Sequence, residues 1–346
     1  MKAARSMSPH IQKNVALHPL TTLKVGGIAS AYVSVTSETE LIEAVRYAQQ
    51  ELLPVYLLGG GSNVLVSDKG LSGLVIHIQS KGSVVTEVDD KVHLRVQAGE
   101  IFDAVVLDTV SQGWWGLENL SHIPGTVGAT PVQNVGAYGV EIKDLIDSVR
   151  VFNTETMSFE MLNNEQCAFA YRDSLFKSPE GKKYIITEVT FLLSKKECPK
   201  ISYIDLKKYF EKKNFPSLVE VRNAVISIRS HKFPNWHEVG TAGSFFKNPM
   251  VSEEKYAALQ TQYPGLPGYK TKNGMVKIAL GWVLDKVLQL RGYREGFVST
   301  YTEQALVLIT HEGATAEEIE HFANSVIEKL KIKIGVLVEW EVTRLQ

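Results

Sequence analysis

The sequence has 346 residues, of which 44% are hydrophobic and 22% are charged, and its formal net charge is −1. This length accommodates two or three domains, and the composition is that of a globular protein. The lack of a basic excess argues against a nucleic-acid partner, and no apolar run reaches the roughly 18 residues needed to cross a bilayer.

The cysteine and histidine content argues against a disulfide-rich or metal-binding protein. The two cysteines, Cys167 and Cys198, are too few for a disulfide framework, and their spacing is not that of metal ligands. The nine histidines include no His-x-x-x-His pair of the zinc-protease kind. Residues 1–14 carry basic side chains without an apolar core, unlike a secretion signal. We therefore expect a reduced, cytoplasmic protein without a bound metal.

The N-terminal part of the sequence predicts a small α/β unit. Residues 31–35 alternate in polarity as a strand does. Ser37, with Glu40 three residues later, predicts a capped helix over 37–50. An apolar run at 55–58 and a strand at 74–78 complete the unit.

A glycine-rich turn follows the run at 55–58. It consists of Gly59, Gly60, Gly61, Ser62 and Asn63. Consecutive backbone N–H groups form a concave anion site where glycine permits the conformation, so we interpret this turn as a phosphate cradle. It is neither a Walker loop nor the dinucleotide fingerprint, because no Gly-Lys-Ser/Thr follows and no alternating glycines open a long helix.

The remaining elements follow from apolar periodicity. They are strands at 83–88, 93–98, 147–153, 158–162, 184–193, 305–309 and 336–342, and helices at 101–112, 203–213, 217–230, 251–262, 277–288 and 315–332.

Residues 121–139 form the most unusual stretch of the chain. They contain four glycines and two prolines, and His122 is the only residue among them that can carry charge. Glycine lets the main chain approach a ligand closely, and proline fixes the backbone. The stretch is either an ordinary surface loop or a rigid main-chain surface that lies against a large flat molecule.

Three short clusters are candidates for chemistry, and each has a plain structural alternative. Arg172 beside Asp173 suits a carboxylate or phosphate ligand, or forms a surface ion pair. Ser244, after a glycine and before two phenylalanines, is a fixed hydroxyl or a capping serine. Glu339 and Glu341 share one face of the predicted terminal strand, where they reach a buried site or remain solvated.

Five pieces in order resemble one family, the UDP-N-acetylenolpyruvoylglucosamine reductases (UDP-N-acetylmuramate dehydrogenases, MurB) of bacterial cell-wall synthesis. The pieces are LGGGSNVL at 58–65, IPGTVGATPVQNVGAY at 123–138, YRDS at 171–174, AGSFFKNP at 242–249 and EWEV at 339–342. In this order they are distributed over nearly the whole chain, and together they are highly specific.

The resemblance implies an α+β flavoprotein of three domains, with FAD bound in the manner of the PCMH, or vanillyl-alcohol-oxidase, type. The first FAD-binding subdomain would span 1–81 and be joined by the C-terminal strand 337–346. The second, with the loop insertion of the longer type I branch, would span 82–230. An α+β substrate-binding domain would span 231–336.

The resemblance also implies which residues bind the non-covalent FAD. The cradle would hold its pyrophosphate, and the glycine-rich loop would line the flavin. The implied residues are Gly59, Gly60, Gly61, Ser62, Asn63, Ile123, Pro124, Gly125, Val127, Gly128, Gln133, Asn134, Gly136 and Ala137.

The implied reaction is the NADPH-dependent reduction of UDP-N-acetylglucosamine enolpyruvate to UDP-N-acetylmuramate. Flavin N5 would give hydride to the vinyl carbon remote from the ether oxygen. Arg172 matches the arginine that pairs with the substrate carboxylate, and Glu341 matches the glutamate next to it. Ser244 matches the serine that protonates the resulting enolate.

The resemblance places the substrate on Tyr171, Tyr203, Lys232, Asn248 and Gln304. Lys232 and Asn248 would hold the diphosphate, and Tyr203 would cover the uracil end. We expect a monomer with no nucleic-acid or membrane partner.

One departure and two alternatives stay open. Trp340 stands where the family commonly has proline, so Glu339 competes with Glu341 for the catalytic role. An oxidase or dehydrogenase of the same superfold would often tether FAD through a histidine, for which His122 is the candidate. A non-catalytic nucleotide-sugar sensor is disfavoured by the intact Arg172, Ser244 and Glu341 set.

Overall fold

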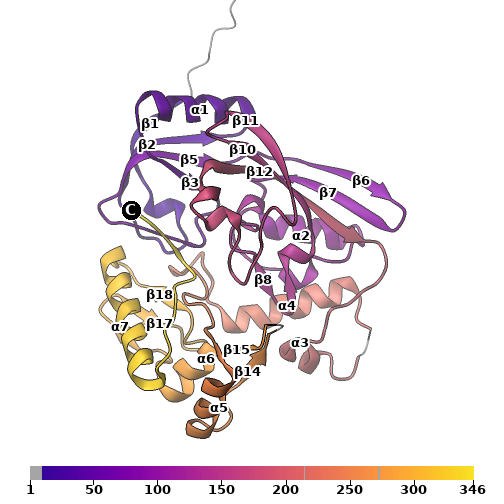
Figure 1. Ribbon diagram of the computed structural model, residues 1–346, viewed down its shortest axis with the longest axis vertical. Coiled ribbons are helices and arrows are strands. Elements are labelled where there is room, and N and C mark those ends of the chain that lie inside the picture. The colour runs from indigo at the N-terminus through magenta and orange to yellow at the C-terminus, as the bar shows by residue number, and fades with distance from the viewer. Residues whose placement is uncertain (1–9, 214, 272) are drawn as a thin grey trace, which may run out of the picture. The chain divides into compact units, whose positions relative to one another are not determined.

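The computed structural model describes residues 10–213, 215–271 and 273–346, which divide into two compact units (Figure 1). Unit 1 consists of the segment that ends at Val15 together with Ala29–Gly61 and Ser72–Arg229. Unit 2 consists of Ala16–Ile28, Ser62–Leu71 and Ser230–Gln346. The division into three domains expected from the sequence stays a prediction.

The first sheet has the order β1-β2-β5-β3, in which β3 and β5 run parallel. Its strands are β1 (Gln12–Ala16), β2 (Ile28–Val35), β5 (Leu71–Ile78) and β3 (Val55–Leu58). Helix α1 (Glu38–Gln50) contributes the buried residues Leu41, Ala44, Val45 and Ala48 to the same core. The predicted cap is confirmed, because the Ser37 hydroxyl accepts the Glu40 N–H; the Glu40 carboxylate accepts the N–H of Thr36.

The second sheet of unit 1 is antiparallel and has the order β11-β10-β12-β7-β6. Figure 1 shows β6 and β7 extending together as a hairpin. The strands are β6 (Ser83–Val88), β7 (Lys91–Gln97), β10 (Ile146–Asn153), β11 (Ser158–Asn163) and β12 (Tyr184–Ser194), close to the predicted bounds.

Helices and short elements complete unit 1. Helices α3 and α4 share a small apolar core of their own with Val110, Trp115 and Tyr138. The elements are α2 (Phe102–Ser111), η2 (Glu118–Leu120), η3 (Val127–Ala129), β8 (Gly136–Ala137), β9 (Val140–Glu141), η4 (Ile142–Asp144), η5 (Leu175–Lys177), η6 (Glu180–Lys183), α3 (Ile204–Tyr209) and α4 (Leu218–Lys232).

Unit 2 has small sheets and one long helix, α7 (Ala316–Ile334), whose apolar face is buried in the unit's core. The sheets are β19 (Thr343–Leu345) parallel to β4 (Val64–Val66); β13 (Met250–Ser252), β15 (Met275–Ile278) and β14 (Gly268–Lys270); and β16 (Arg294–Glu295), β17 (Val298–Thr300) and β18 (Leu308–Thr310). The other helices are η1 (His18–Leu20), α5 (Glu253–Gln262), α6 (Leu280–Trp282) and the π-helical turn η7 (Val283–Val287).

Several predicted bounds are wrong because tertiary pairing overrides local periodicity. The strand predicted at 336–342 is reduced to an isolated bridge between Trp340 and Phe246, and the terminal strand is β19. The helix predicted at 277–288 loses its start to β15, which pairs with β13 and β14. The helix predicted at 251–262 begins at Glu253, because the Ser252 side chain caps it.

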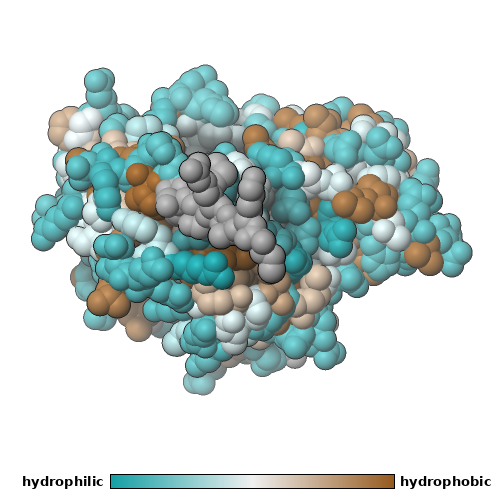
Figure 2. Space-filling view, turned by 90° about the horizontal axis from the view of Figure 1, so that it is seen from above, coloured by the Kyte–Doolittle hydropathy of each residue, from teal (hydrophilic) through white to brown (hydrophobic). Residues whose placement is uncertain are grey.

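The exposed face seen in Figure 2 is dominated by hydrophilic residues, with apolar residues in separate patches. Across the described residues, no helix is long and apolar enough to cross a membrane.

The N-terminus of α7 provides a test of local stability. The Thr315 hydroxyl accepts the Glu318 N–H (3.1 Å), and the Glu318 carboxylate accepts the Thr315 N–H (3.0 Å). We predict that Thr315→Ala lowers the free energy of unfolding by about 1 kcal/mol in urea denaturation followed by circular dichroism. Thr261→Ala is the matched control on exposed α5 and should change it by less than about 0.5 kcal/mol. Equal effects of the two changes would contradict the capping role.

Candidate active site

Within unit 1, the predicted cradle and the predicted flavin loop are in direct backbone contact. A Cβ atom at Gly60 would lie 2.7 Å from the Cα of Gly125, and one at Gly59 would lie 2.5 Å from the Thr126 hydroxyl oxygen. Real Cβ atoms do not approach other atoms so closely, so only glycine fits at Gly60. Two stretches far apart in sequence thus form one surface of main chain and small side chains.

The first half of the loop at 121–139 is bound along the end of β7 and the start of α2. The N–H of Phe102 donates to Gly125 O (3.1 Å). The N–H groups of Val127 and Gly128 donate to Glu100 O (2.9 Å) and Ala98 O (2.8 Å). This backbone pairing fixes Gly125, Val127 and Gly128, three of the residues predicted to line the flavin.

The second half of the loop depends on Asn134, which is fully buried. Its amide nitrogen donates to the Glu141 carboxylate (3.1 Å) and to Ala170 O (2.9 Å), and its amide oxygen accepts the Lys143 N–H (3.1 Å). The side chain of Asn134 therefore holds the loop together, which leaves its backbone for the predicted cofactor contact.

Arg172 is aimed at this half of the loop. It lies in the tight turn that joins the bridged residues Ala170 and Asp173, with a left-handed φ of 53°. Its Nη2 donates to Gly136 O (2.7 Å), and a Cβ at Gly136 would lie 3.1 Å from its Nη1. The glycine at 136 thus lets the guanidinium lie directly against the loop.

Charge around Arg172 includes the carboxylate of Glu141. Burial alone would raise the pKa of Glu141, but Lys143 (Nζ–Oε2 2.9 Å), Asn134 and Arg172 together lower it. Glu141 is therefore ionised at neutral pH and contributes negative charge beneath the arginine.

Ser244 lies in unit 2 on a segment that is paired on both sides. Ser244 bridges Val307, and the Phe245 N–H donates to Leu306 O (2.9 Å). Gly243, with φ of 72°, turns the chain just before it. Ser244 is half-buried, and among the described residues its hydroxyl has no hydrogen-bond partner. The backbone on both sides of Ser244 is therefore fixed.

The segment with Ser244 pairs with Val307 and Leu306 on one side and with the segment of Glu341 on the other. The N–H of Glu341 donates to Phe245 O (2.8 Å), and its carbonyl accepts the side-chain amide of Asn63 (3.1 Å). Asn63 also accepts the Thr343 N–H through its backbone carbonyl (3.0 Å). Glu341 is half-buried, whereas the Glu339 side chain is 77% exposed and pairs with Lys247 (2.9 Å). The two glutamates have different environments.

The predicted substrate-binding residues are distributed over both units. Lys232 ends α4, and the Asn248 side-chain oxygen accepts the Leu280 N–H (2.9 Å) at the start of α6. The Gln304 amide packs against Gly281, where a Cβ would lie 2.6 Å from its oxygen. In unit 1, Tyr203 precedes α3 and packs edge-on against Tyr138, with 5.5 Å between the ring centroids. The guanidinium carbon of Arg172 lies 5.4 Å from the centroid of the Tyr171 ring.

The predicted site residues are distributed over both units. Unit 1 brings together the three cradle glycines, the loop and Arg172, and unit 2 brings together Ser244, Glu341 and Asn63. Unit 1 holds Gly59, Gly60, Gly61, Ile123, Pro124, Gly125, Val127, Gly128, Gln133, Asn134, Gly136, Ala137, Tyr171, Arg172 and Tyr203; unit 2 holds Ser62, Asn63, Lys232, Ser244, Asn248, Gln304 and Glu341.

Sequence reasoning missed His77, which supports the cradle from β5. Its Nδ1 contacts the Tyr32 hydroxyl (2.7 Å), and its Nε2 contacts the Gln79 amide (2.6 Å). Burial lowers the pKa of His77, while a hydrogen bond with the Gly59 backbone opposes this shift. No sequence signal indicated this role, because a single histidine in a strand is common.

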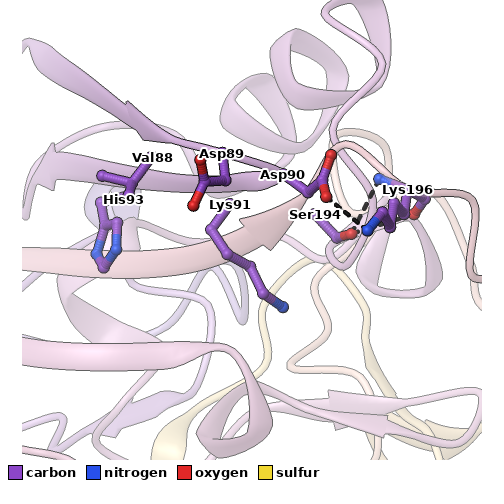
Figure 3. A pocket seen from close by; sticks show the side chains of 7 residues that line it. All are labelled: Val88, Asp89, Asp90, Lys91, His93, Ser194 and Lys196. Carbon is purple, nitrogen blue, oxygen red and sulfur yellow. Dashed lines mark hydrogen bonds and ion pairs between the residues drawn. The ribbon is translucent and has the colours of Figure 1, made fainter.

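Unit 1 contains cavities, two of which have lysines in their linings. Figure 3 shows one of about 440 Å³ at the turn between β6 and β7, where Lys196 pairs with Asp90 (2.5 Å). Its lining contains no predicted site residue: Val88, Asp89, Asp90, Lys91, His93, Ser194 and Lys196. The other, of about 880 Å³, is lined by Gly139 and by residues from Pro199 to Lys213, including four lysines.

The residues present fit FAD. The cradle offers backbone without side chains at Gly59 to Gly61, and Gly61 adopts a φ of 62° suited to an anion-binding turn. The loop it contacts is uncharged apart from His122, as a flat isoalloxazine ring requires.

Comparisons with known proteins identify the family of this chain. Residues 29–156 match the FAD binding domain, and residues 235–345 match the C-terminal domain of UDP-N-acetylenolpyruvoylglucosamine reductase. The reductase of Neisseria meningitidis serogroup B is 40% identical over 95% of this chain and 97% of its own length. The chain belongs to the UDP-N-acetylenolpyruvoylglucosamine reductase family.

Other members extend the match. The reductase of Pseudomonas aeruginosa is 36% identical over 97% of this chain and 99% of its own length. The crystal structure of the Thermus caldophilus reductase (MurB) superimposes with a TM-score of 0.69 at 26% identity, covering 98% of this chain and all of the other. The predicted α+β fold with an FAD-binding domain is thereby confirmed.

The backbone contact between cradle and loop can be tested with two glycine variants. In Gly60→Ala the new methyl group meets backbone at Gly125, which cannot rotate away, so we predict at least about tenfold weaker FAD binding in fluorescence titrations. In Gly59→Ala the obstacle is the Thr126 hydroxyl, a side chain that can rotate, so the loss should be smaller. The reverse order would contradict the contact.

Proposed function

We propose that the chain catalyses the NADPH-dependent reduction of UDP-N-acetylglucosamine enolpyruvate to UDP-N-acetylmuramate, a step of peptidoglycan precursor synthesis. Family membership supports this reaction. The structural observation that most strongly supports the proposed reaction is in unit 2, where the segment with Ser244 pairs with the segment with Glu341. That pairing joins two short motifs distant in sequence.

When bound, FAD supplies the redox step, accepting hydride from NADPH and giving it to the vinyl carbon remote from the ether oxygen. The role of the protein is then to stabilise the charge that builds on the adjacent carbon and its carboxylate. Gly59, Gly60, Gly61, Ser62 and Asn63 are proposed to hold the pyrophosphate. The residues proposed to line the flavin are Ile123, Pro124, Gly125, Val127, Gly128, Gln133, Asn134, Gly136 and Ala137.

Arg172 is proposed to pair with the substrate carboxylate. Hydride addition to an electron-rich enol ether is difficult unless the carboxylate withdraws charge. A cation fixed where negative charge develops stabilises the transition state more than the ground state. The hydrogen bond from Arg172 to Gly136 O (2.7 Å) supplies that fixation.

Ser244 is proposed to protonate the enolate carbon. A serine hydroxyl is a weak acid, but an enolate is a strong base, so placement of the hydroxyl matters most. The backbone pairing of this segment on both sides supplies the placement.

Glu341, rather than Glu339, is proposed as the glutamate beside the substrate carboxyl. Glu341 is half-buried, with its N–H and carbonyl fixed by Phe245 and Asn63. The 77% exposed side chain of Glu339 is instead engaged by Lys247.

Tyr171, Tyr203, Lys232, Asn248 and Gln304 are proposed to bind the rest of the substrate. The lysine-lined cavity that adjoins Gly139 supports a role for the segment around Tyr203, because ammonium groups suit a nucleotide diphosphate. We further propose three domains at 1–81 with 337–346, 82–230 and 231–336, a monomeric state and a cytoplasmic location.

The role of Ser244 predicts a split between the half-reactions. Ser244→Ala should leave reduction of the flavin by NADPH intact and slow its reoxidation by substrate by on the order of 10²–10⁴-fold in stopped-flow absorbance. Ser325→Ala, which removes an α7 hydroxyl bonded to Phe322 O, is the control and should change neither rate. Equal loss in both half-reactions would exclude Ser244 as the proton donor.

The two glutamates provide a second test. Glu341→Gln should slow reoxidation by substrate by at least about 10²-fold, whereas Glu339→Gln weakens an exposed ion pair with Lys247 and should stay within about threefold. Stopped-flow reoxidation of both variants, reduced beforehand with NADPH, measures the difference. A larger loss in the Glu339 variant would reverse the assignment.

A further inference from the structure

Helix α4 presents two arginines from one face. Arg222 and Arg229 are seven residues apart, which is about two helical turns, so their side chains lie on the same side. Arg222 is buried among the apolar residues of this face, where an arginine requires a specific partner. Arg222 reaches the loop 121–139 through Asp103, and Arg229 reaches it directly.

Arg222 reaches the loop through Asp103 of α2. Its guanidinium forms a two-pronged contact with the carboxylate, at 2.7 and 3.1 Å. The same carboxylate accepts the backbone N–H of His122 (2.6 Å). Burial alone would raise the pKa of Asp103, but the hydrogen bonds from Arg222 and His122 lower it, so the carboxylate is charged at neutral pH.

Arg229 contacts the loop near both of its ends. Its Nε donates to the carbonyl of His122 (3.0 Å) near the start of the loop. Its charge also acts on Tyr138 near the end of the loop, where burial raises the pKa of the tyrosine to about 12 and the guanidinium opposes that shift. One guanidinium therefore acts at both ends of the loop.

His122, which lies between Asp103 and Arg229, has an unfavourable backbone conformation. His122 has a φ of 60°, which is costly for a residue other than glycine and persists only where the surroundings enforce it. Asp103 holds the N–H of His122 and Arg229 holds its carbonyl. The direction of the chain into Ile123, Pro124 and Gly125 follows from that conformation.

We infer that Arg229 is a positioning residue for FAD, which acts by closing the loop 121–139 through His122 and Tyr138, with Asp103 and Arg222 fixing the opposite side of His122. The inference rests on the proposed function in one respect, that this loop lines the flavin. Its readout is FAD binding and not turnover.

The experiment compares Arg229→Ala with Arg229→Lys. Fluorescence titration of the apoproteins with FAD gives the dissociation constant, and the visible spectrum reports the flavin environment. Arg229→Ala should bind FAD at least about tenfold more weakly with an altered spectrum, because the charged hydrogen bond to His122 O and the positive charge beside Tyr138 are both lost. Arg229→Lys keeps the charge but not the fork, so its affinity should be intermediate. Millimolar guanidinium should restore FAD affinity in Arg229→Ala and leave the wild type unchanged.

Arg150→Ala is the matched control. Arg150 is also a half-buried arginine of unit 1, bound to Glu38 and Glu188 and placed over the Phe159 ring (4.3 Å), and none of these three partners belongs to the loop. It should bind FAD with wild-type affinity after a similar loss of thermal stability. Unchanged affinity in Arg229→Ala, absence of guanidinium rescue, or an equal loss in Arg150→Ala would each overturn the inference.

Two outcomes are separated in advance. If Arg229→Ala does not fold, Arg229→Lys alone decides, and wild-type affinity with a wild-type spectrum in that variant overturns the inference. If the wild-type protein binds FAD but does not reduce UDP-N-acetylglucosamine enolpyruvate, the proposed substrate is wrong. The FAD titrations then still test the positioning role of Arg229.

Discussion

The close approach of two backbone segments at Gly60 and Gly125 is the constraint on which unit 1 depends. Neither segment is stable as regular structure, since one is a turn after β3 and the other a long loop rich in glycine and proline. Their contact leaves no space for a Cβ at Gly60. A surface made of main chain is thereby built, and it suits a cofactor with a charged end and a flat aromatic end.

A main-chain surface must be held from outside, because it has few side chains of its own. Unit 1 does this with charged and polar groups placed beneath the loop. Asp103 and Arg229 hold His122, and Asn134 connects the loop to the turn that carries Arg172. The loop itself is thus nearly uncharged, while the groups that hold it include the charged side chains of Asp103 and Arg229. Burial strengthens these contacts, since a buried polar group without a partner is costly.

Unit 2 positions the residues proposed for catalysis in a different way. Ser244 and Glu341 belong to short segments that pair through backbone hydrogen bonds without forming long strands. The amide of Asn63 joins a third segment to them. Irregular segments of this kind can aim individual side chains, whereas a regular strand would alternate them between its two faces.

The sequence by itself determined the long elements and the motifs. Strong periodicity and capping signals located α1, α7 and the antiparallel strands β6, β10 and β12, because these depend on local pattern. The glycine cradle, the loop and the family followed from residue types that few other structures require. Only the tertiary structure decided that the terminal strand is β19, that β15 replaces the start of a predicted helix, and that Arg222, Arg229, Asp103 and His77 support the site. These features depend on partners distant in sequence, and neither periodicity nor residue type specifies which distant groups meet.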